Sequence, residues 1–229
     1  MSPQAQAYTP YIQVQACNRL WELERAADLE SLWEAMTELP LSADFVDDER
    51  LPYWTELWPA SVALAQWLYQ QRDSIAGKAC LDLGCGLGLT AMVGQWLGAQ
   101  VLAMDYEEAA LRFARKNAVL NNISQPLWTV MDWRRPAVAR GSIARVWGGD
   151  IMYETRFVKP VLDFLEYSLA PQGRAWVAEP CRTVYEAFRA GFLQRGWSGK
   201  RVHSQVVDPL YAQPARVTVH VWELCPPLR

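Results

Sequence analysis

The sequence predicts an α/β fold, with a doubly wound, mostly parallel sheet of seven strands, helices on both faces and an antiparallel last strand. Three observations predict it. Short apolar runs of strand length alternate with longer amphipathic runs from residue 79 onward. One apolar run stops at three closely spaced glycines, Gly84, Gly86 and Gly88, which suit a turn from a strand into a helix. The last two apolar runs are joined by residues 209–214, too few for a helical crossover, so their strands should be antiparallel.

The first 50 residues are predicted to be an N-terminal extension. A strand is expected at 12–16, and a helix at 29–36, where Leu29, Leu32 and Trp33 recur at helical spacing. The pattern breaks at Pro40, and an acidic linker follows at 44–50. We therefore expect an extension at 1–50 and one domain at 51–229. Three roles stay open for the extension: a lid, a partner-docking arm, or a strand pair that extends the sheet.

The first half of the domain predicts helix 60–69, strand 79–83, helix 87–97, strand 100–105 and helix 107–120. Pro59 suits the first position of the first of these helices. Gly98 ends the second helix, and the strand after it ends in Asp105. The third helix carries acids in its first turn and an apolar face that includes Ala110 and Phe113.

The second half predicts strand 126–131, strand 145–153, helix 158–169, strand 174–178, helix 184–195 and strands 202–207 and 217–224. The strand at 126–131 runs into Asp132 and Trp133, and the strand at 145–153 carries glycines and an acid toward its end. Strands that alternate with helices specify a parallel sheet covered on both faces. Ligands of such a sheet bind at the carboxyl ends of its strands.

The glycine turn predicts a nucleotide-like ligand. It lets a ligand approach the backbone closely and leaves the first N–H groups of the helix free. The dinucleotide fingerprint requires a third glycine three positions after the second, where this chain has Leu89. Asp105, about 20 residues further on, can take a pair of ribose hydroxyls. Together these features indicate an adenosine-bearing ligand without a diphosphate, commonly S-adenosylmethionine. The alternative is a turn that only packs helix on sheet.

Composition narrows the class of protein. Hydrophobic residues make up 51% and charged residues 21% of the 229 residues, as in a soluble globular protein. No apolar stretch approaches the ~20 residues that span a bilayer, and the N-terminus has no export signal, so we expect a cytoplasmic protein without a membrane partner. The formal charge of −3 and scattered basic residues indicate no nucleic-acid partner. Five cysteines without a C-x-x-C pair, and two histidines, predict no metal. Twelve tryptophans suggest aromatic walls.

Several motifs resemble a known family. The glycine motif Leu81-Asp-Leu-Gly-Cys-Gly-Leu-Gly, with Asp105 and Asp132-Trp133, resembles the class I S-adenosylmethionine-dependent methyltransferases, whose fold is Rossmann-like. Three further motifs resemble the seven-stranded protein lysine methyltransferases, methyltransferase family 16: Pro52-Tyr-Trp-Thr-Glu-Leu-Trp-Pro, Gly148-Gly-Asp-Ile-Met-Tyr and Val219-His-Val-Trp-Glu. Within this family the chain looks most similar to the branch that methylates the β subunit of electron transfer flavoprotein, with its bacterial relatives. The resemblance covers roughly residues 50–224.

The resemblance implies S-adenosylmethionine as cofactor, S-adenosylhomocysteine as product and no metal. The implied cofactor contacts are Trp58, Asp82, Gly84, Gly86, Gly88, Asp105, Tyr106, Asp132, Trp133 and Gly149. The implied catalytic residues at the substrate mouth are Asp150 and Tyr153, and Trp54 and Arg182 are the implied substrate contacts. Relatives often carry Ala where this chain has Gly149, so the pocket wall lacks a methyl group here.

Each assignment to the acceptor side has a structural alternative. Trp54 could cap the core, and Asp150 could cap the segment that follows its strand. Tyr153 could be an ordinary half-buried tyrosine, and Arg182 a surface ion pair. Three functions follow in order of preference: methyl transfer to a lysine of a protein substrate, methyl transfer to a small-molecule amine or hydroxyl, and cofactor-dependent docking without catalysis.

Overall fold

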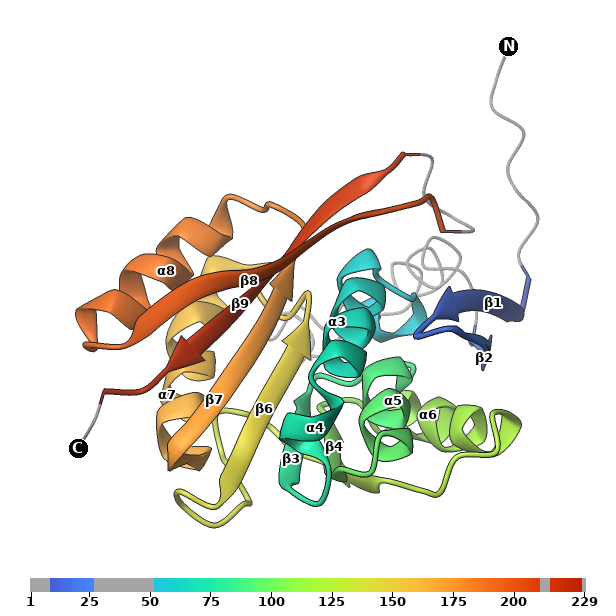
Figure 1. Ribbon diagram of the computed structural model, residues 1–229, viewed down its shortest axis with the longest axis horizontal. Coiled ribbons are helices and arrows are strands. Elements are labelled where there is room, and N and C mark those ends of the chain that lie inside the picture. The colour runs from blue at the N-terminus through green and yellow to red at the C-terminus, as the bar shows by residue number, and fades with distance from the viewer. Residues whose placement is uncertain (1–8, 27–51, 211–214, 228–229) are drawn as a thin grey trace, which may run out of the picture.

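The computed structural model describes residues 9–26, 52–210 and 215–227. A seven-stranded sheet has the order β5-β4-β3-β6-β7-β9-β8, and β1 and β2 form a separate two-stranded sheet (Figure 1). The strands are β1 Tyr11–Ala16, β2 Arg19–Glu24, β3 Ala79–Leu83, β4 Gln100–Asp105, β5 Leu127–Val130, β6 Ile143–Gly149, β7 Leu169–Glu179, β8 Ser198–Val207 and β9 Val217–Cys225. The helices are η1 Tyr53–Thr55, α3 Pro59–Gln70, α4 Arg72–Ile75, α5 Leu89–Trp96, α6 Glu108–Leu120, η2 Thr155–Phe157, α7 Val158–Ser168 and α8 Val184–Gln194.

The fold class is confirmed. Strands β3 to β7 pair in parallel, whereas β9 is antiparallel to both of its neighbours, β7 and β8. Helices α3 and α5 lie on one face of the sheet and α7 and α8 on the other (Figure 1). Each face has its own apolar core, as Leu64 and Met92 belong to one and Phe164 and Phe188 to the other. No helix among the described residues has the length and apolar character needed to cross a membrane.

Some element boundaries differ from the prediction. Helix α5 begins at Leu89 rather than 87 because Gly86 and Gly88 have left-handed backbone and continue the turn. Strand β6 ends at Gly149 rather than 153 because Asp150 also has a left-handed φ of 56°. Strands β7 and β8 begin at Leu169 and Ser198, earlier than 174 and 202, because pairing with β6 and β9 continues there. The predicted helix at 29–36 and the linker at 44–50 lie outside the described residues.

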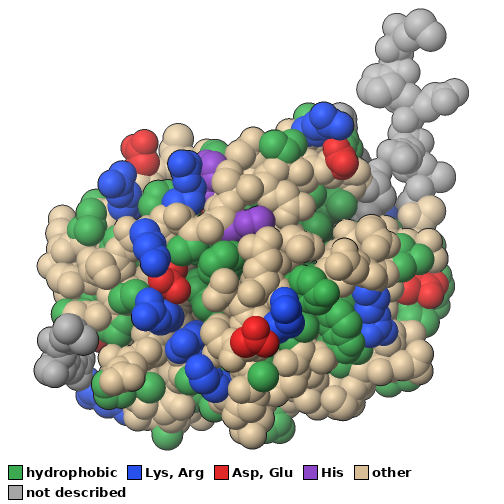
Figure 2. All heavy atoms as spheres, viewed as in Figure 1, with side chains coloured by type: hydrophobic (Ala, Val, Ile, Leu, Met, Phe, Trp, Pro, Cys, Tyr) green, Lys and Arg blue, Asp and Glu red, His purple; other side chains and the backbone are tan. Residues whose placement is uncertain are grey.

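The N-terminal hairpin, β1 with β2, does not extend the main sheet. It forms its own sheet, and Val14, Trp21 and Leu23 enter the same apolar core as α3 and α5. The boundary predicted between residues 50 and 51 stays a prediction. Figure 2 shows one face of the molecule, where basic, acidic and hydrophobic side chains are interspersed.

Candidate active site

A cavity of about 300 Å³ lies at the carboxyl ends of the central strands. Its walls come from the loop before α3, the glycine turn after β3, and the segments that follow β4, β5, β6 and β7. The predicted site residues that line it are Trp54, Trp58, Gly84, Gly86, Gly88, Asp105, Tyr106, Asp132, Trp133, Gly149, Asp150, Tyr153 and Arg182. The structure therefore brings together residues that are more than 120 positions apart in the chain, as Trp54 and Arg182 are.

Asp82 is the one predicted site residue that does not line the cavity. Alternation along β3 directs it away from the face that holds Leu81 and Leu83, and the Thr90 hydroxyl of α5 donates a hydrogen bond of 2.6 Å to its carboxylate. Asp82 is fully buried, and this burial raises its pKa to about 7. In this position Asp82 ties strand β3 to helix α5 beneath the turn, and its role as a cofactor contact stays a prediction.

The glycine turn has a conformation that side chains disfavour. Gly84, Gly86 and Gly88 have φ values of 69°, 51° and 86°. A Cβ on Gly88 would lie 2.8 Å from the Cβ of Ala114, and one on Gly84 would lie 3.2 Å from Ile151. Glycine is therefore required here both by backbone conformation and by close packing.

Asp105 holds the turn from the end of β4. Its carboxylate accepts hydrogen bonds from the backbone N–H of Gly86 at 2.8 Å and of Glu107 at 3.0 Å. Burial raises the pKa of Asp105 to about 6, and the two N–H donors counter part of that rise. Since this value is below neutral pH, the carboxylate remains mostly ionised and able to accept hydrogen bonds from hydroxyl groups.

Five aromatic rings form a continuous wall of the cavity. Trp58 contacts Tyr53 with ring centroids 6.1 Å apart, and Tyr53 contacts Tyr153 at 5.0 Å. Phe157 then contacts Tyr153 at 4.9 Å and Trp133 at 5.3 Å. All the contacts are edge-on, which is a favourable arrangement for aromatic pairs. The wall joins the loop before α3 to the segments after β5 and β6.

One end of the cavity holds an ion pair between Asp150, which is buried, and Arg182, which is partly exposed to solvent. Asp150 is 7% exposed, and its two carboxylate oxygens accept hydrogen bonds from Nε and Nη2 of Arg182 at 2.9 and 2.8 Å. The Arg182 guanidinium also lies 6.0 Å from the ring centroid of Trp58. Hydrogen bonding to Asp150 raises the pKa of Arg182. Thus the ion pair that was one alternative for Arg182 is formed with a residue of the same cavity.

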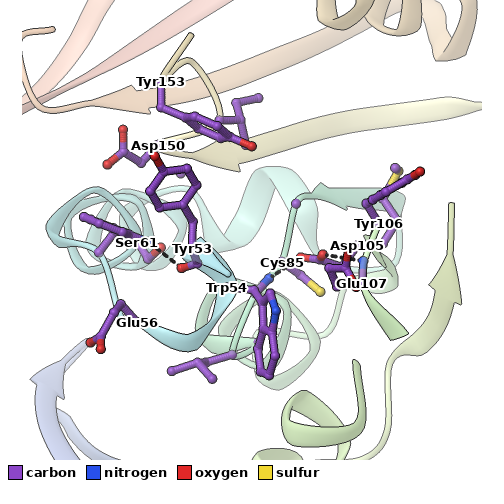
Figure 3. Close-up of a pocket in the computed structure, with 18 of the residues that line it drawn as sticks. Tyr53, Trp54, Glu56, Ser61, Cys85, Asp105, Tyr106, Glu107, Asp150 and Tyr153 are labelled. Atoms are coloured by element: carbon purple, nitrogen blue, oxygen red, sulfur yellow. Dashed lines mark hydrogen bonds between the residues drawn. The ribbon is translucent and has the colours of Figure 1, made fainter. Parts of the chain in front are cut away.

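Figure 3 shows how the cavity residues are divided. Asp150, Tyr153 and Tyr53 lie together on one side, and Asp105, Tyr106 and Glu107 on the other. Burial raises the pKa of Tyr153 well above its usual range, so its phenol remains neutral.

Two further predicted residues have specific neighbours. Gly149 packs against the first turn of α3, because a Cβ there would lie 3.1–3.2 Å from atoms of Ser61. Asp132 accepts hydrogen bonds from the backbone N–H and the Nε of Arg134 at 2.8–3.0 Å.

Sequence reasoning missed several residues of the cavity. Tyr53, Glu56, Ser61 and Phe157 also line it. Tyr53 and Glu56 belong to the tryptophan motif before α3, so this motif could have predicted them as cavity residues together with Trp54 and Trp58. Phe157 carries no such signal, since it reaches the cavity only through the short helix η2.

The chain is similar in sequence to known methyltransferases. The sequence model of a family described as lysine methyltransferase matches residues 45–188 of this chain. The electron transfer flavoprotein beta subunit lysine methyltransferase of Xenopus laevis is 31% identical over 146 residues, 59% of this chain and 55% of that protein. A histone-arginine methyltransferase of Homo sapiens is 26% identical over 156 residues, 64% of this chain and 80% of that protein. This chain spans about half the length of its flavoprotein-modifying relatives.

Solved structures show the same fold. Magnesium protoporphyrin IX methyltransferase from Synechocystis PCC 6803, with bound S-adenosylmethionine, has a TM-score of 0.57 at 18% identity, covering 86% of this chain and 90% of that one. An S-adenosylmethionine-dependent O-methyltransferase from Thermotoga maritima has a TM-score of 0.55 at 13% identity, covering 72% of this chain and 65% of that one. At these identities the likeness concerns the fold alone.

Proposed function

Because this chain belongs to the lysine methyltransferase family, we propose that it transfers a methyl group from S-adenosylmethionine to a lysine side chain of a protein substrate. One observation carries the proposal: a single cavity holds the left-handed glycine turn with Asp105 on one side and Asp150 with Tyr153 on the other. The first pair suits a nucleoside, and the second suits a cation that arrives from outside.

The residues present fit the cofactor. The cavity of about 300 Å³ is at the lower end of the usual size of small-molecule sites. The glycine turn would hold the methionine part, Asp105 the ribose hydroxyls, and Tyr106, Asp132 and Trp133 the adenine, with Trp58 and Gly149 at its edges. When bound, S-adenosylmethionine supplies a methyl group that its sulfonium already makes electrophilic. The protein must therefore orient the acceptor and exclude water.

The acceptor side supports an amine. A lysine ammonium with a pKa near ~10.4 must lose a proton before its nitrogen can react. The aromatic wall disfavours the charged form by excluding water, while Asp150 offers a negative charge to the incoming group. Tyr153 remains a neutral phenol and can orient the nitrogen by a hydrogen bond. Since Arg182 occupies both oxygens of Asp150, an incoming cation must share or replace that contact.

Incubation with methyl-labelled S-adenosylmethionine and an extract of the source cells tests the proposal. Label in a protease-sensitive band, mapped to a lysine, supports it, and label only in small solutes would instead favour a metabolite methyltransferase. Asp150→Asn should lower transfer by about 100-fold or more, since removing one charged transition-state contact commonly costs that much. Its affinity for S-adenosylhomocysteine should stay within about twofold of the original. Asp163→Asn is the control, because Asp163 pairs with Lys159 on the surface of α7.

Arginine is a second candidate acceptor. Asp150 already binds the guanidinium of Arg182 by two parallel hydrogen bonds, which is the geometry that an arginine substrate would use. A relative at 26% identity is named as a histone-arginine methyltransferase. Mass spectrometry of the labelled protein distinguishes methyl-lysine from methyl-arginine.

A further inference from the structure

We propose that Arg25 and Asn117 are positioning residues through which the N-terminal hairpin fixes the shape of the cofactor pocket. The hairpin is β1 with β2, and it is joined to the pocket by two separate buried contacts. The inference rests on the proposed function, because it takes the cavity to be the S-adenosylmethionine site. It gives the hairpin the role of a fixed support for two walls of the pocket rather than the role of a lid.

The first contact runs through Asn117 of helix α6, which is fully buried. Its Nδ2 donates hydrogen bonds to the carbonyl of Leu87 at 3.0 Å and to the carbonyl of Glu24 at 3.1 Å. Its Oδ1 accepts a hydrogen bond from the N–H of Glu24 at 2.7 Å. Leu87 lies in the turn between Gly86 and Gly88, so one amide joins the end of β2 directly to the glycine turn.

The second contact is an ion pair between Arg25 and Glu56. Nη1 of Arg25 donates to the two carboxylate oxygens of Glu56 at 2.8 and 3.0 Å, and the two side chains are 4% and 9% exposed. Nε and the backbone N–H of Arg25 donate to the carbonyls of Thr9 and Pro10, which tie it to the start of β1. Glu56 lines the cavity from the loop that also carries Tyr53 and Trp58.

The hairpin itself is firmly docked. Trp21 and Leu23 are fully buried in the core that the hairpin shares with α3 and α5. Asn121, the residue directly after α6, accepts a hydrogen bond from the N–H of Glu22 at 3.0 Å and donates one to its carbonyl at 2.6 Å. The hairpin backbone is thus paired with α6 by two successive amide side chains. A lid that opens would have to break these buried contacts together.

Loss of either pocket contact should distort the site. Removing Arg25 takes away two hydrogen bonds and a charge that stabilise the Glu56 carboxylate in its position, and removing the Asn117 amide takes away the hydrogen bonds that it forms with Leu87 and Glu24. Small-molecule sites must be held within about 0.5 Å of the binding geometry. The loop before α3 and the glycine turn are the two walls affected, so cofactor affinity is the quantity that should change.

The test is calorimetric titration of the full chain with S-adenosylhomocysteine. Arg25→Met and Asn117→Ala should each raise the dissociation constant by about tenfold, within the usual range of coupling between sites. Arg25→Lys should recover part of the loss because it keeps the charge. Two controls are matched. Asn121→Ala removes the neighbouring amide contact with the hairpin, and Lys116→Met removes an exposed ion pair with Glu24, while neither residue contacts the cavity.

Transfer kinetics add a second readout. The KM for S-adenosylmethionine should rise in Arg25→Met and Asn117→Ala, while kcat at saturation stays within about twofold of the original. The reason is that a distorted pocket binds the cofactor less tightly by the same amount in the ground state and in the transition state. The proposal is overturned if these variants are folded at the assay temperature and bind S-adenosylhomocysteine as tightly as the original chain. It is equally overturned if the Asn121 and Lys116 variants lose as much affinity.

Two failures of the proposed function are distinguishable from a failure of this inference. A different methyl acceptor would leave the binding test unchanged, whereas a cavity that is not the S-adenosylmethionine site would leave the unaltered chain unable to bind S-adenosylhomocysteine. The positioning role is then decided by hydrogen exchange of the ligand-free protein. The amides of residues 84–90 should exchange faster in Asn117→Ala than in Asn121→Ala, and equal rates in the two variants would overturn the inference.

Discussion

Asp82 illustrates how one buried carboxyl group supports the site without entering it. It lies in the middle of β3, fully buried, and accepts a hydrogen bond from Thr90 in the first turn of α5. A carboxyl group in such a place is easier to keep protonated than ionised, because burial penalises the charge. Its pKa of about 7 follows from this burial.

This shift predicts a pH dependence of stability. The folded pKa of Asp82, about 7, lies above the ordinary value, so the folded chain binds more protons than the unfolded chain between these values. The free energy of unfolding should therefore fall as pH rises from about 4 to about 7. A single carboxyl group such as Asp82 can contribute at most ~1.4 kcal/mol per pH unit to this fall. Asp82→Asn should flatten the dependence, as measured by urea unfolding at several pH values.

The comparison between variants isolates Asp82 from other groups. Asp105 has a pKa of about 6, so it also makes the free energy of unfolding fall as pH rises, and it does so in the original chain and in Asp82→Asn alike. Asp163→Asn is the control, because the pKa of Asp163 is lowered by its partners Lys159 and Arg195 although partial burial acts the other way. The contribution of Asp163 to the free energy of unfolding is lost only as pH falls into the acidic range. An unchanged slope in Asp82→Asn would contradict the assigned cause.

At the scale of elements, the glycine turn is held from two sides. Asp105 of β4 binds the N–H of Gly86, and α6 packs closely against Gly88. Both contacts need the left-handed backbone that the glycines supply. The turn is therefore fixed in shape before any ligand arrives.

Gly88→Ala tests how closely the turn is packed. Left-handed backbone costs about 1–2 kcal/mol for Ala, and the new methyl group would lie 2.8 Å from Ala114, which adds an overpacking cost of about 1–3 kcal/mol. Gly77→Ala is a matched control, since Gly77 has φ of 71° and no atom within 4 Å of the added Cβ. Urea unfolding should show a clearly larger loss for Gly88→Ala. Equal losses would mean that packing against α6 contributes nothing.

Local pattern was enough to predict the central elements. Strands β3 and β4 match the predicted ranges because apolar runs, glycines and a terminal acid mark both ends. The ends of β6, β7 and β8 differ because they depend on a non-glycine residue with positive φ and on pairing with distant strands. In the same way, motifs predicted Asp105 and Asp150, whereas the pairing of Arg25 with Glu56 arises only from the folded chain. The alternation of Asp82 with Leu81 and Leu83 along β3 could likewise have placed Asp82 on the α5 face.

At the scale of the whole molecule, the hairpin and the sheet share one core. Ile12, Val14 and Leu23 belong to the same buried cluster as residues of α3, α5 and β9. An appended module would instead keep a core of its own. The described part of the extension should therefore unfold together with the sheet.

Trp21→Ala tests this expectation. Trp21 is fully buried, donates its indole N–H to the carbonyl of Ala16 at 3.1 Å, and packs edge-on against Trp96 of α5 at 5.8 Å. Its truncation should lower the free energy of unfolding by about 3–5 kcal/mol, the usual cost of losing a large buried ring.

The loss should appear in the whole protein, because the cavity left by Trp21 opens into the shared core. Urea transitions followed by far-UV circular dichroism and by hydrogen exchange in β3 should shift together and stay single. Leu20→Ala is the control in the same hairpin: Leu20 is 53% exposed, and exposed positions usually change stability by less than about 0.5 kcal/mol. If Trp21→Ala instead produced an early transition confined to the hairpin, with β3 unaffected, the hairpin would be a separate folding unit, and the cavity would have to keep its shape without it.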